Sequence, residues 1–239
     1  MSGTIFNKIL FLDIETVPQY PDFFSAPEPW RELWEKKAEK LKTQEDDDPA
    51  SLFPKAGIYS EFGKIICISV AIIKNDKLHV KSFHSEDNEQ QLLMEFAEMV
   101  NGFYERNKDM QLCAHNGKEF DFPYISRRML IHGIPLPNPF DNSGKKPWEI
   151  MHIDTMEMWK FGDFKNYTSL NLLSYIFGIP SPKDDIDGSM VYETFYAEKG
   201  LDRIVKYCEK DVITVAQVLR KFNYLPLIDE ENIEIRNDE

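Results

Sequence analysis

Two carboxylates stand two positions apart, directly after an apolar run near the start of the chain. Residues 9–12 are all apolar, and Asp13, Ile14 and Glu15 follow them. The run is typical of a buried strand, and because side chains alternate along a strand, Asp13 and Glu15 point to one face. Neighbouring carboxylates repel each other unless one is protonated or a cation offsets them, and such hard oxygen ligands suit Mg²⁺ or Mn²⁺. An isolated Asp-x-Glu more often simply ends a strand in solvent, so a metal site requires further acids.

A third acid, Asp121, follows the stretch 115–120, between a short apolar run at 111–114 and a predicted helix. Binding sites commonly gather at turns between strands and helices in α/β sheets. Asp121 would serve equally as an ordinary cap for that helix, and Asn116 with Gly117 suits an ordinary turn. Taken alone, this stretch is compatible with a metal ligand and with a purely structural role.

The last predicted helix, residues 201–222, gives the stronger signal. Its apolar stripe consists of Leu201, Ile204, Val205, Cys208, Val212, Val215 and Leu219. Tyr207 and Asp211, four residues apart, lie together at the margin of this stripe. An aspartate at the boundary of a core is costly unless it is paired or binds a metal, and the strand carboxylates are available as neighbours. A surface aspartate beside an edge tyrosine is the alternative, but the joint occurrence of these acids favours a shared site.

Strands and helices are predicted for most of the chain, and their order determines what can bring the acids together. Strands are expected at 9–12, 63–73, 78–83, 111–114 and 150–154, with a hairpin turn at 75–77. Helices are expected at 30–41, from a cap at Asp87 to Phe103, from Asp121 onward, and at 169–177, 191–197 and 201–222. This order predicts an α/β fold, a mixed β-sheet of about five strands flanked by α-helices.

The formal net charge of −13 argues against the broad basic face that sequence-specific duplex binders use. Residues 45–48 contribute −4 and residues 229–239 contribute −5, so the rest of the chain is only mildly acidic. An enzyme that grips one strand end needs few phosphate contacts and tolerates such a surface. The three cysteines lack paired spacing, and neither a signal peptide nor a membrane span is evident. We therefore expect a cytoplasmic protein in reducing surroundings, with no membrane contact.

Together these residues resemble the three motifs of the 3′–5′ exonucleases of the ribonuclease H-like fold, in the form that uses a tyrosine (DEDDy). The matching residues are Asp13 and Glu15 in the first motif, Asn116, Phe120 and Asp121 in the second, and Tyr207 and Asp211 in the third. The histidine form would need His where Lys206 stands. The resemblance covers about residues 5–222, and it is strongest to the proofreading exonuclease domains of family B DNA polymerases and to a stand-alone bacterial family related to them. It implies an exonuclease domain over 1–225, with an inserted segment at about 18–60, and an acidic C-terminal tail at 226–239.

By resemblance, four acids would hold two Mg²⁺ or Mn²⁺ ions. Asp13 would bridge both ions, Glu15 and Asp211 would hold the ion that activates water, and Asp121 would serve the ion that stabilises the leaving 3′ oxygen. Tyr207 would orient the attacking water. Two ions placed in this way can stabilise both the attacking and the leaving oxygens of an in-line phosphoryl displacement.

The resemblance also implies that Asn116 and Phe120 contact the terminal nucleotide, since a ring stacks on any base without reading sequence. Asp154, at the end of the predicted fifth strand, is expected to support the site or to be structural. The implied activity is degradation of single-stranded nucleic acid, DNA before RNA, from its 3′ end, with release of nucleoside 5′-monophosphates. An endonuclease on the same fold and a non-catalytic nucleic-acid-binding module are the alternatives, although the presence of all four acids and the tyrosine disfavours both.

Overall fold

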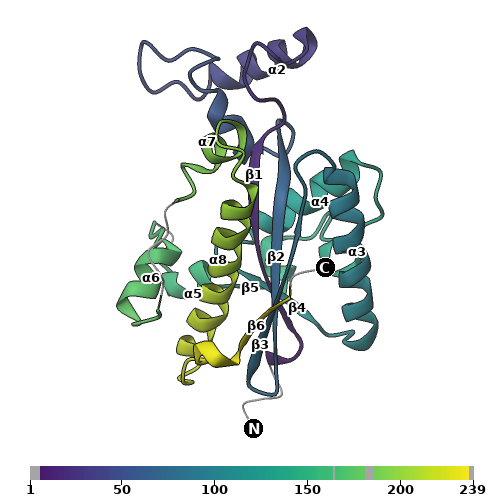
Figure 1. Ribbon diagram of the computed structural model, residues 1–239, viewed down its shortest axis with the longest axis vertical. Helices are drawn as coiled ribbons and strands as arrows, with labels where there is room; N and C mark the ends of the chain where they lie inside the picture. The colour runs from purple at the N-terminus through teal and green to yellow at the C-terminus, as the bar shows by residue number, and fades with distance from the viewer. Residues whose placement is uncertain (1–5, 164, 181–185, 237–239) are drawn as a thin grey trace.

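A six-stranded mixed sheet forms the centre of the computed structural model, which describes residues 6–163, 165–180 and 186–236 (Figure 1). Across the sheet the strands lie in the order β5-β4-β1-β2-β3-β6. Their bounds are β1 Ile9–Pro18, β2 Gly63–Lys74, β3 Lys77–His84, β4 Gln111–Ala114, β5 Ile153–Asp154 and β6 Ile233–Arg236. The first three strands are antiparallel neighbours, whereas β4 runs parallel to β1, β5 parallel to β4 and β6 parallel to β3. The predicted mixed sheet is confirmed, with one strand more than expected.

Helices cover both faces of this sheet. Their bounds are α2 Glu28–Ala38, α3 Glu89–Arg106, α4 Asp121–Ile131, α5 Thr155–Lys160, α6 Leu170–Ile176, α7 Val191–Tyr196 and α8 Leu201–Phe222. In Figure 1, α8 crosses one face of the sheet and α3 lies on the other. The bounds of α8 are those that its apolar stripe predicts. Within the described ranges, no helix has both the length and the apolar character that crossing a membrane requires.

β1 is the strand on which the two layers meet, because its alternate side chains pack on opposite faces. The two apolar sets are Leu10, Leu12 and Ile14 on the side of α3 and α4, and Ile9, Phe11 and Val17 on the side of α8. By the same alternation, Asp13 and Glu15 belong to the face that α8 covers. The predicted placement of these two acids on one face is therefore confirmed.

The outer edge of the sheet combines a predicted hairpin with a strand that the sequence did not predict. Asn75 and Asp76 both adopt left-handed backbone, with φ of 53° and 57°, which lets a two-residue turn match the twist of β2 and β3. β6 then pairs with β3, with Ile233 opposite Leu78. This sixth strand was missed because it is short and lies among the acidic residues near the C-terminus, where the local pattern favours solvated chain.

The cap of α3 differs from the prediction by one residue. Asn88, not Asp87, is the cap, and its side chain accepts a hydrogen bond of 3.0 Å from the amide of Gln91. Either short polar side chain could cap a helix, but Glu89 is held by Arg128 in a buried ion pair. That tertiary contact favours the start of α3 at Glu89 and makes the residue before it the cap.

The inserted segment forms a small packed unit at one end of the sheet, where Figure 1 shows α2 beyond the end of β1. Trp34 is fully buried in an aromatic cluster and donates a hydrogen bond of 2.7 Å to the carbonyl oxygen of Pro49. Tyr192 and Tyr196 of α7 donate to backbone carbonyl oxygens at the start of the segment. The predicted amphipathic helix is present, and its apolar side packs within the insertion itself.

Candidate active site

The candidate acids lie in a gap between two apolar clusters on the α8 face of the sheet. On one side of the gap, Phe11 packs with the residues of α8 from Val212 onward. On the other side, Val17 packs with the first two turns of α8, from Leu201 to Cys208. The clusters press α8 against β1 above and below the gap. They thereby hold polar side chains of both elements at one level.

Asp13, Glu15 and Cys208 meet in this gap. A potential ligand atom of each lies within 4.8 Å of those of the others. The thiol of Cys208 donates to Oδ2 of Asp13 at 3.3 Å and approaches the carbonyl oxygen of Asp13 at 3.4 Å. The sequence suggested only a core role for Cys208. The available signal was its place on α8 directly after Tyr207 and three residues before Asp211, which puts it at the level of the acids.

A β-bulge in β2 brings a second cysteine toward the same gap. Glu15 pairs with Cys67 but Thr16 pairs with Ile65, so Ile66 is an extra residue in β2. As a result the consecutive residues Ile66 and Cys67 both belong to the cluster on the α8 face. Sequence periodicity cannot predict that Ile66 and Cys67 face the same side, because the bulge exists only once β1 and β2 are paired.

Asp121 approaches the gap from the other side of β1. It is the first residue of α4, where the capping position is taken by Phe120, and its side chain is 4% exposed. The carboxylate accepts a hydrogen bond from the backbone amide of Ile14. That amide is accessible because the pairing of β1 with β4 extends only as far as Phe11. The alternative in which Asp121 is an ordinary helix cap is therefore wrong.

Asp154 holds the turn that carries the second motif. Its carboxylate accepts four backbone hydrogen bonds of 2.9–3.2 Å, from Asn116, Lys118, Met156 and Glu157. These bonds join the turn after β4 to the start of α5. Asp154 therefore supports the turn that carries the second motif.

The turn after β4 itself is tightly packed. Asn116 has left-handed backbone, with φ of 65°. A Cβ atom on Gly117 would lie 2.4 Å from the Cβ atom of Ala114 and 2.9 Å from the ring of Phe122. Phe120 is partly buried, with its ring centroid 5.3 Å from that of Tyr124. Asn116 and Phe120 thus stand on the same turn as Asp121, on a backbone that has little room to move.

Burial and mutual repulsion raise the pKa values of these acids. Burial, followed by the charges of Asp211, Asp121 and Glu15, raises the pKa of Asp13 well above its ordinary value. Burial and the charge of Asp211 act in the same way on the pKa of Glu15. Burial, with further contributions from Asp154 and Asp211, raises the pKa of Asp121 to about 7. The carboxylates therefore form one electrostatic group whose members oppose each other's ionisation.

Tyr207 belongs to the same group. Its phenol donates a hydrogen bond to the side chain of Asp211. Burial, followed by the charges of Asp211, Glu15 and Asp13, raises the pKa of Tyr207 above its ordinary value of 10.0. The hydroxyl therefore stays protonated near neutral pH and remains a hydrogen-bond donor beside the acids.

The donor set suits divalent cations that prefer oxygen ligands. Asp13 and Glu15 have ligand atoms within 4.8 Å of each other, and the charges of Asp121 and Asp211 act on both. When ionised, these four carboxylates carry the charge that two divalent cations neutralise, and carboxylate oxygens are the ligands that Mg²⁺ and Mn²⁺ favour. Burial raises the pKa of the Cys208 thiol well above its ordinary value, so this group is a neutral donor to Asp13 and not a competing thiolate ligand. The residues present thus fit the predicted metal centre.

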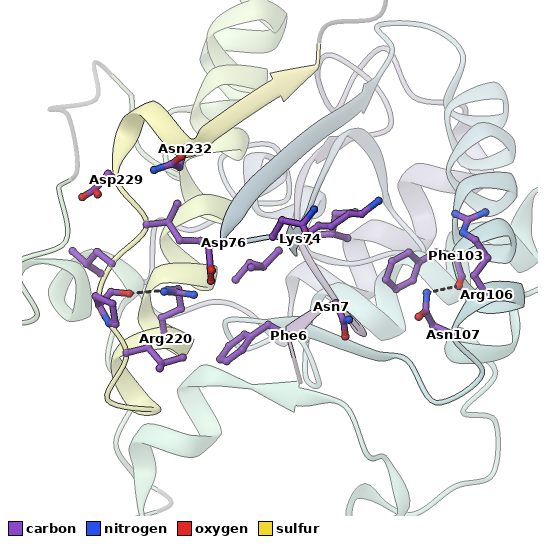
Figure 2. A pocket seen from close by; sticks show the side chains of 17 residues that line it. Phe6, Asn7, Lys74, Asp76, Phe103, Arg106, Asn107, Arg220, Asp229 and Asn232 are labelled. Carbon is purple, nitrogen blue, oxygen red and sulfur yellow. Dashed lines mark hydrogen bonds between the residues drawn. The ribbon is translucent and has the colours of Figure 1, made fainter. Parts of the chain in front are cut away.

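One cavity of the described structure lies away from the acids. It has a volume of about 990 Å³ and opens between the β2–β3 turn and the segment that follows α8. Figure 2 shows Arg220 and Asp76 near each other in this cavity, with Arg106 and Asn107 on its opposite side. Its lining includes none of the motif residues. The candidate site is therefore defined by its side-chain chemistry and not by cavity size.

A mixed sheet in this order, crossed by a long helix with acids from both at one level, is an architecture of the ribonuclease H-like class. A family B DNA polymerase from the hyperthermophilic archaeon Pyrobaculum calidifontis has a similar fold, with a TM-score of 0.53 and 16% sequence identity. The similarity covers 90% of this chain and 24% of the polymerase. Within that class, residues 58–232 match the family described as predicted 3′–5′ exonucleases related to the exonuclease domain of PolB. The chain belongs to this family.

Curated relatives are archaeal DNA polymerases. The chain is 26% identical over 178 residues to a DNA polymerase from Pyrococcus glycovorans, a match that covers 67% of this chain and 22% of the polymerase. It is 24% identical over 182 residues to DNA polymerase 1 from Pyrococcus abyssi, covering 68% of this chain and 23% of that protein. The matched region is thus less than a quarter of the length of either relative.

Proposed function

We propose that this chain is a metal-dependent 3′–5′ exonuclease that degrades single-stranded nucleic acid, DNA before RNA, and releases nucleoside 5′-monophosphates. The observation that carries the proposal is the convergence of four acids and one tyrosine from β1, α4 and α8 into a single electrostatic group. Membership of a family described by 3′–5′ exonuclease activity agrees with it.

Asp13, Glu15, Asp121 and Asp211 would hold two Mg²⁺ or Mn²⁺ ions. Asp13 would contact both ions, Glu15 and Asp211 would contact the ion beside the attacking water, and Asp121 would contact the other. When bound, such ions make water a better nucleophile and stabilise the charge that develops on the leaving 3′ oxygen. The carboxylates themselves would position the cations, and the bound cations would offset the mutual repulsion that raises the pKa values of the acids.

Tyr207 would position the water. Its neutral hydroxyl lies at the edge of the acid group, where Asp211 orients it by accepting its proton in a hydrogen bond. On the neighbouring turn, Phe120 would place its ring against the terminal base and Asn116 would contact the same nucleotide. A stacked ring holds any base, so this arrangement suits a nuclease without sequence preference.

The test compares Tyr207→Phe with Asp211→Ala in single-turnover degradation of one labelled oligonucleotide at saturating Mn²⁺. A positioned hydrogen-bonding group contributes about 10²- to 10⁴-fold to rate, so Tyr207→Phe is expected to lose activity within that range. Asp211→Ala should fall further, because it removes a metal ligand. Tyr196→Phe is the matched control, since Tyr196 lies on the neighbouring helix α7 and its hydroxyl donates a hydrogen bond to the backbone carbonyl oxygen of Pro18. If Tyr207→Phe turns over at the wild-type rate, the hydroxyl of Tyr207 does not position water, and its ring serves only as an aromatic residue at the edge of the last helix.

The products distinguish the alternatives. With a 5′-labelled single strand, an exonuclease of this polarity gives a ladder that shortens from the 3′ end, and the ladder disappears in a chelator. Internal cuts would support the endonuclease, and an intact strand with measurable binding would support the non-catalytic module. Running DNA and RNA strands of the same sequence in parallel decides the preference between them.

A further inference from the structure

The surface formed by α5, α6 and the loop between them exposes aromatic rings that folding does not require. Phe161 is 89% exposed, Tyr175 of α6 is 82% exposed and Tyr167 is 63% exposed. All three lie within residues 161–175 of a chain whose other large rings are mostly packed in clusters. We call this surface the α5–α6 platform and define it by Phe161, Tyr167 and Tyr175.

Phe161 occupies a backbone conformation that is sterically unfavourable for a residue with a bulky side chain. It follows α5 with left-handed backbone, φ 44° and ψ 35°, and Gly162 continues the turn with φ of 89°. A glycine at 161 would make the same turn without the steric penalty that a bulky side chain incurs there. A strained backbone that presents a ring to water points to a role outside the fold itself.

The ring of Phe161 nevertheless rests on a rigid base. Its centroid lies 6.4 Å from that of Trp159, and Trp159 lies 5.6 Å from Phe177 and stacks on Phe222 of α8 at 6.0 Å, with 9° between the planes. Phe161 therefore contacts a packed aromatic group at one edge and is otherwise open. A ring presented in this way can stack on a flat ligand at little cost in side-chain freedom.

The platform is continuous with the candidate active site. His115, next to Asn116, makes hydrogen bonds of 2.9 Å to the hydroxyl of Thr155 in α5 and 2.8 Å to the carbonyl oxygen of Thr168 in the following loop. Lys160 lies 4.2 Å from the ring centroid of Tyr167 and 3.9 Å from the carboxylate of Glu119. These contacts join the second motif to Tyr167 through Lys160, the residue that precedes Phe161 in the chain.

Charge does not bar a phosphate backbone from this path, although the chain as a whole is acidic. Glu119 is paired with Lys160, and Glu157 of α5 with Lys118 at 2.6 Å. Glu119 and Glu157 thus each have a cation beside them, whereas the formal net charge of the chain is −13. A strand leaving the acid centre would meet less repulsion here than over the chain's acidic runs.

We propose that the α5–α6 platform binds the nucleotides on the 5′ side of the one being removed, with Phe161 and Tyr167 stacking on successive bases of a single strand. This inference rests on the proposed function for its direction along the strand. It makes binding depend on strand length, because a strand too short to reach past the second motif gains nothing from the platform.

Fluorescence anisotropy with 5′-fluorescein oligothymidylates of three and of twelve nucleotides, in Ca²⁺, tests the platform. For the longer strand, Phe161→Ala is expected to weaken binding about 5- to 150-fold, the range that one to three kcal/mol of base stacking represents. For the shorter strand the change should be less than about twofold. Phe161→Trp keeps a ring and should bind as the wild type does. Trp148→Ala is the matched control, since Trp148 is 74% exposed and precedes β5, at the opposite end of that strand from α5.

Phe161→Gly separates binding from folding. It should raise the melting temperature, because it relieves the left-handed strain, and yet weaken binding of the longer strand as Phe161→Ala does. A ring that serves only the fold predicts the opposite for stability. An unchanged affinity of Phe161→Ala for the longer strand, or equal losses for both strands, would overturn the platform and would leave it as a surface for another protein or a second copy.

The two proposals fail in different ways. If the wild type does not shorten the twelve-nucleotide strand with Mg²⁺ or Mn²⁺, the exonuclease assignment is wrong, whatever the anisotropy shows. If the wild type shortens that strand and binds it no more tightly than the three-nucleotide strand, the exonuclease stands and the platform does not.

Discussion

Replacing Asp121 by asparagine should make the metal-free protein more stable at pH 8 and abolish its activity. The substitution keeps the shape of the side chain and an oxygen that can accept the amide of Ile14, but it removes the charge. In the wild type, burial raises the pKa of Asp121 to about 7, against 3.8 for an unperturbed aspartate. The folded state therefore binds this proton more tightly than the unfolded state does.

The sign and size of the effect follow from that difference. A raised pKa in the folded state means that stability falls as the pH rises from about 4 to about 7, because the unfolded chain releases the proton first. Between pH 5 and pH 7 the loss is about 1.4 kcal/mol for each pH unit, and above pH 7 it levels off. Asp121 alone therefore lowers the free energy of unfolding by roughly 3 kcal/mol between pH 5 and pH 8. Asp121→Asn should recover a large part of this.

Urea denaturation of both proteins in a chelator, at pH 5 and at pH 8, gives the required double difference. Titrating groups outside the acid group contribute equally to both proteins and cancel. Removing the charge of Asp121 also eases the ionisation of Asp13 and Glu15, which adds to the difference in the same direction. Asp46→Asn is the control, since Asp46 is an exposed acid in the 45–48 run. If wild type and Asp121→Asn lose the same stability between the two pH values, Asp121 is not held in the folded state with a raised pKa, and the reasoning about a repulsive acid centre fails.

Three further predictions concern the metal and the supporting structure. Millimolar Mg²⁺ or Mn²⁺ should raise the melting temperature of the wild type, since an ion that binds only the folded state stabilises it, and the rise should be smaller for Asp121→Asn. Arg128→Met should cost roughly 3–5 kcal/mol in urea denaturation, because it leaves the buried carboxylate of Glu89 without the guanidinium that bonds both of its oxygens, whereas the exposed neighbour Arg127→Met should cost under about 0.5 kcal/mol. Gly117→Ala should lower stability by about 1–3 kcal/mol and reduce turnover, since its Cβ atom would press on Ala114 and Phe122; unchanged turnover would mean that this turn need not hold its position.

Local periodicity predicted the parts of the fold that depend on one element at a time. The bounds of α8 and the shared face of Asp13 and Glu15 follow from periods of 3.6 and 2.0 residues, which the backbone imposes wherever the element forms. The hairpin turn follows in the same way, since Asn75 and Asp76 tolerate left-handed backbone. These features required no knowledge of what packs against them.

The features that were missed arise from contacts between elements. The bulge that turns Ile66 and Cys67 to the same face appears only in the register between β1 and β2. The start of α3 at Glu89 depends on the distant Arg128. The hydrogen bond from the Cys208 thiol to Asp13 forms only because α8 packs across β1. In each case the local sequence allows more than one arrangement, and a contact between elements decides which one forms.

The positions of the motif acids could be predicted from the sequence even though their contacts could not. A core-facing strand and a core-facing helix are both expected to be apolar along their buried face, and each departs from that rule at a motif, Asp13 with Glu15 on the strand and Tyr207 with Asp211 on the helix. One departure has an ordinary explanation at the surface. Two departures that the fold brings to one level, between the apolar clusters on either side, cannot both be surface residues. The apolar packing of those clusters offsets the repulsion between the carboxylates. The fold can therefore hold the acids together without a bound cation, in an arrangement that can bind one.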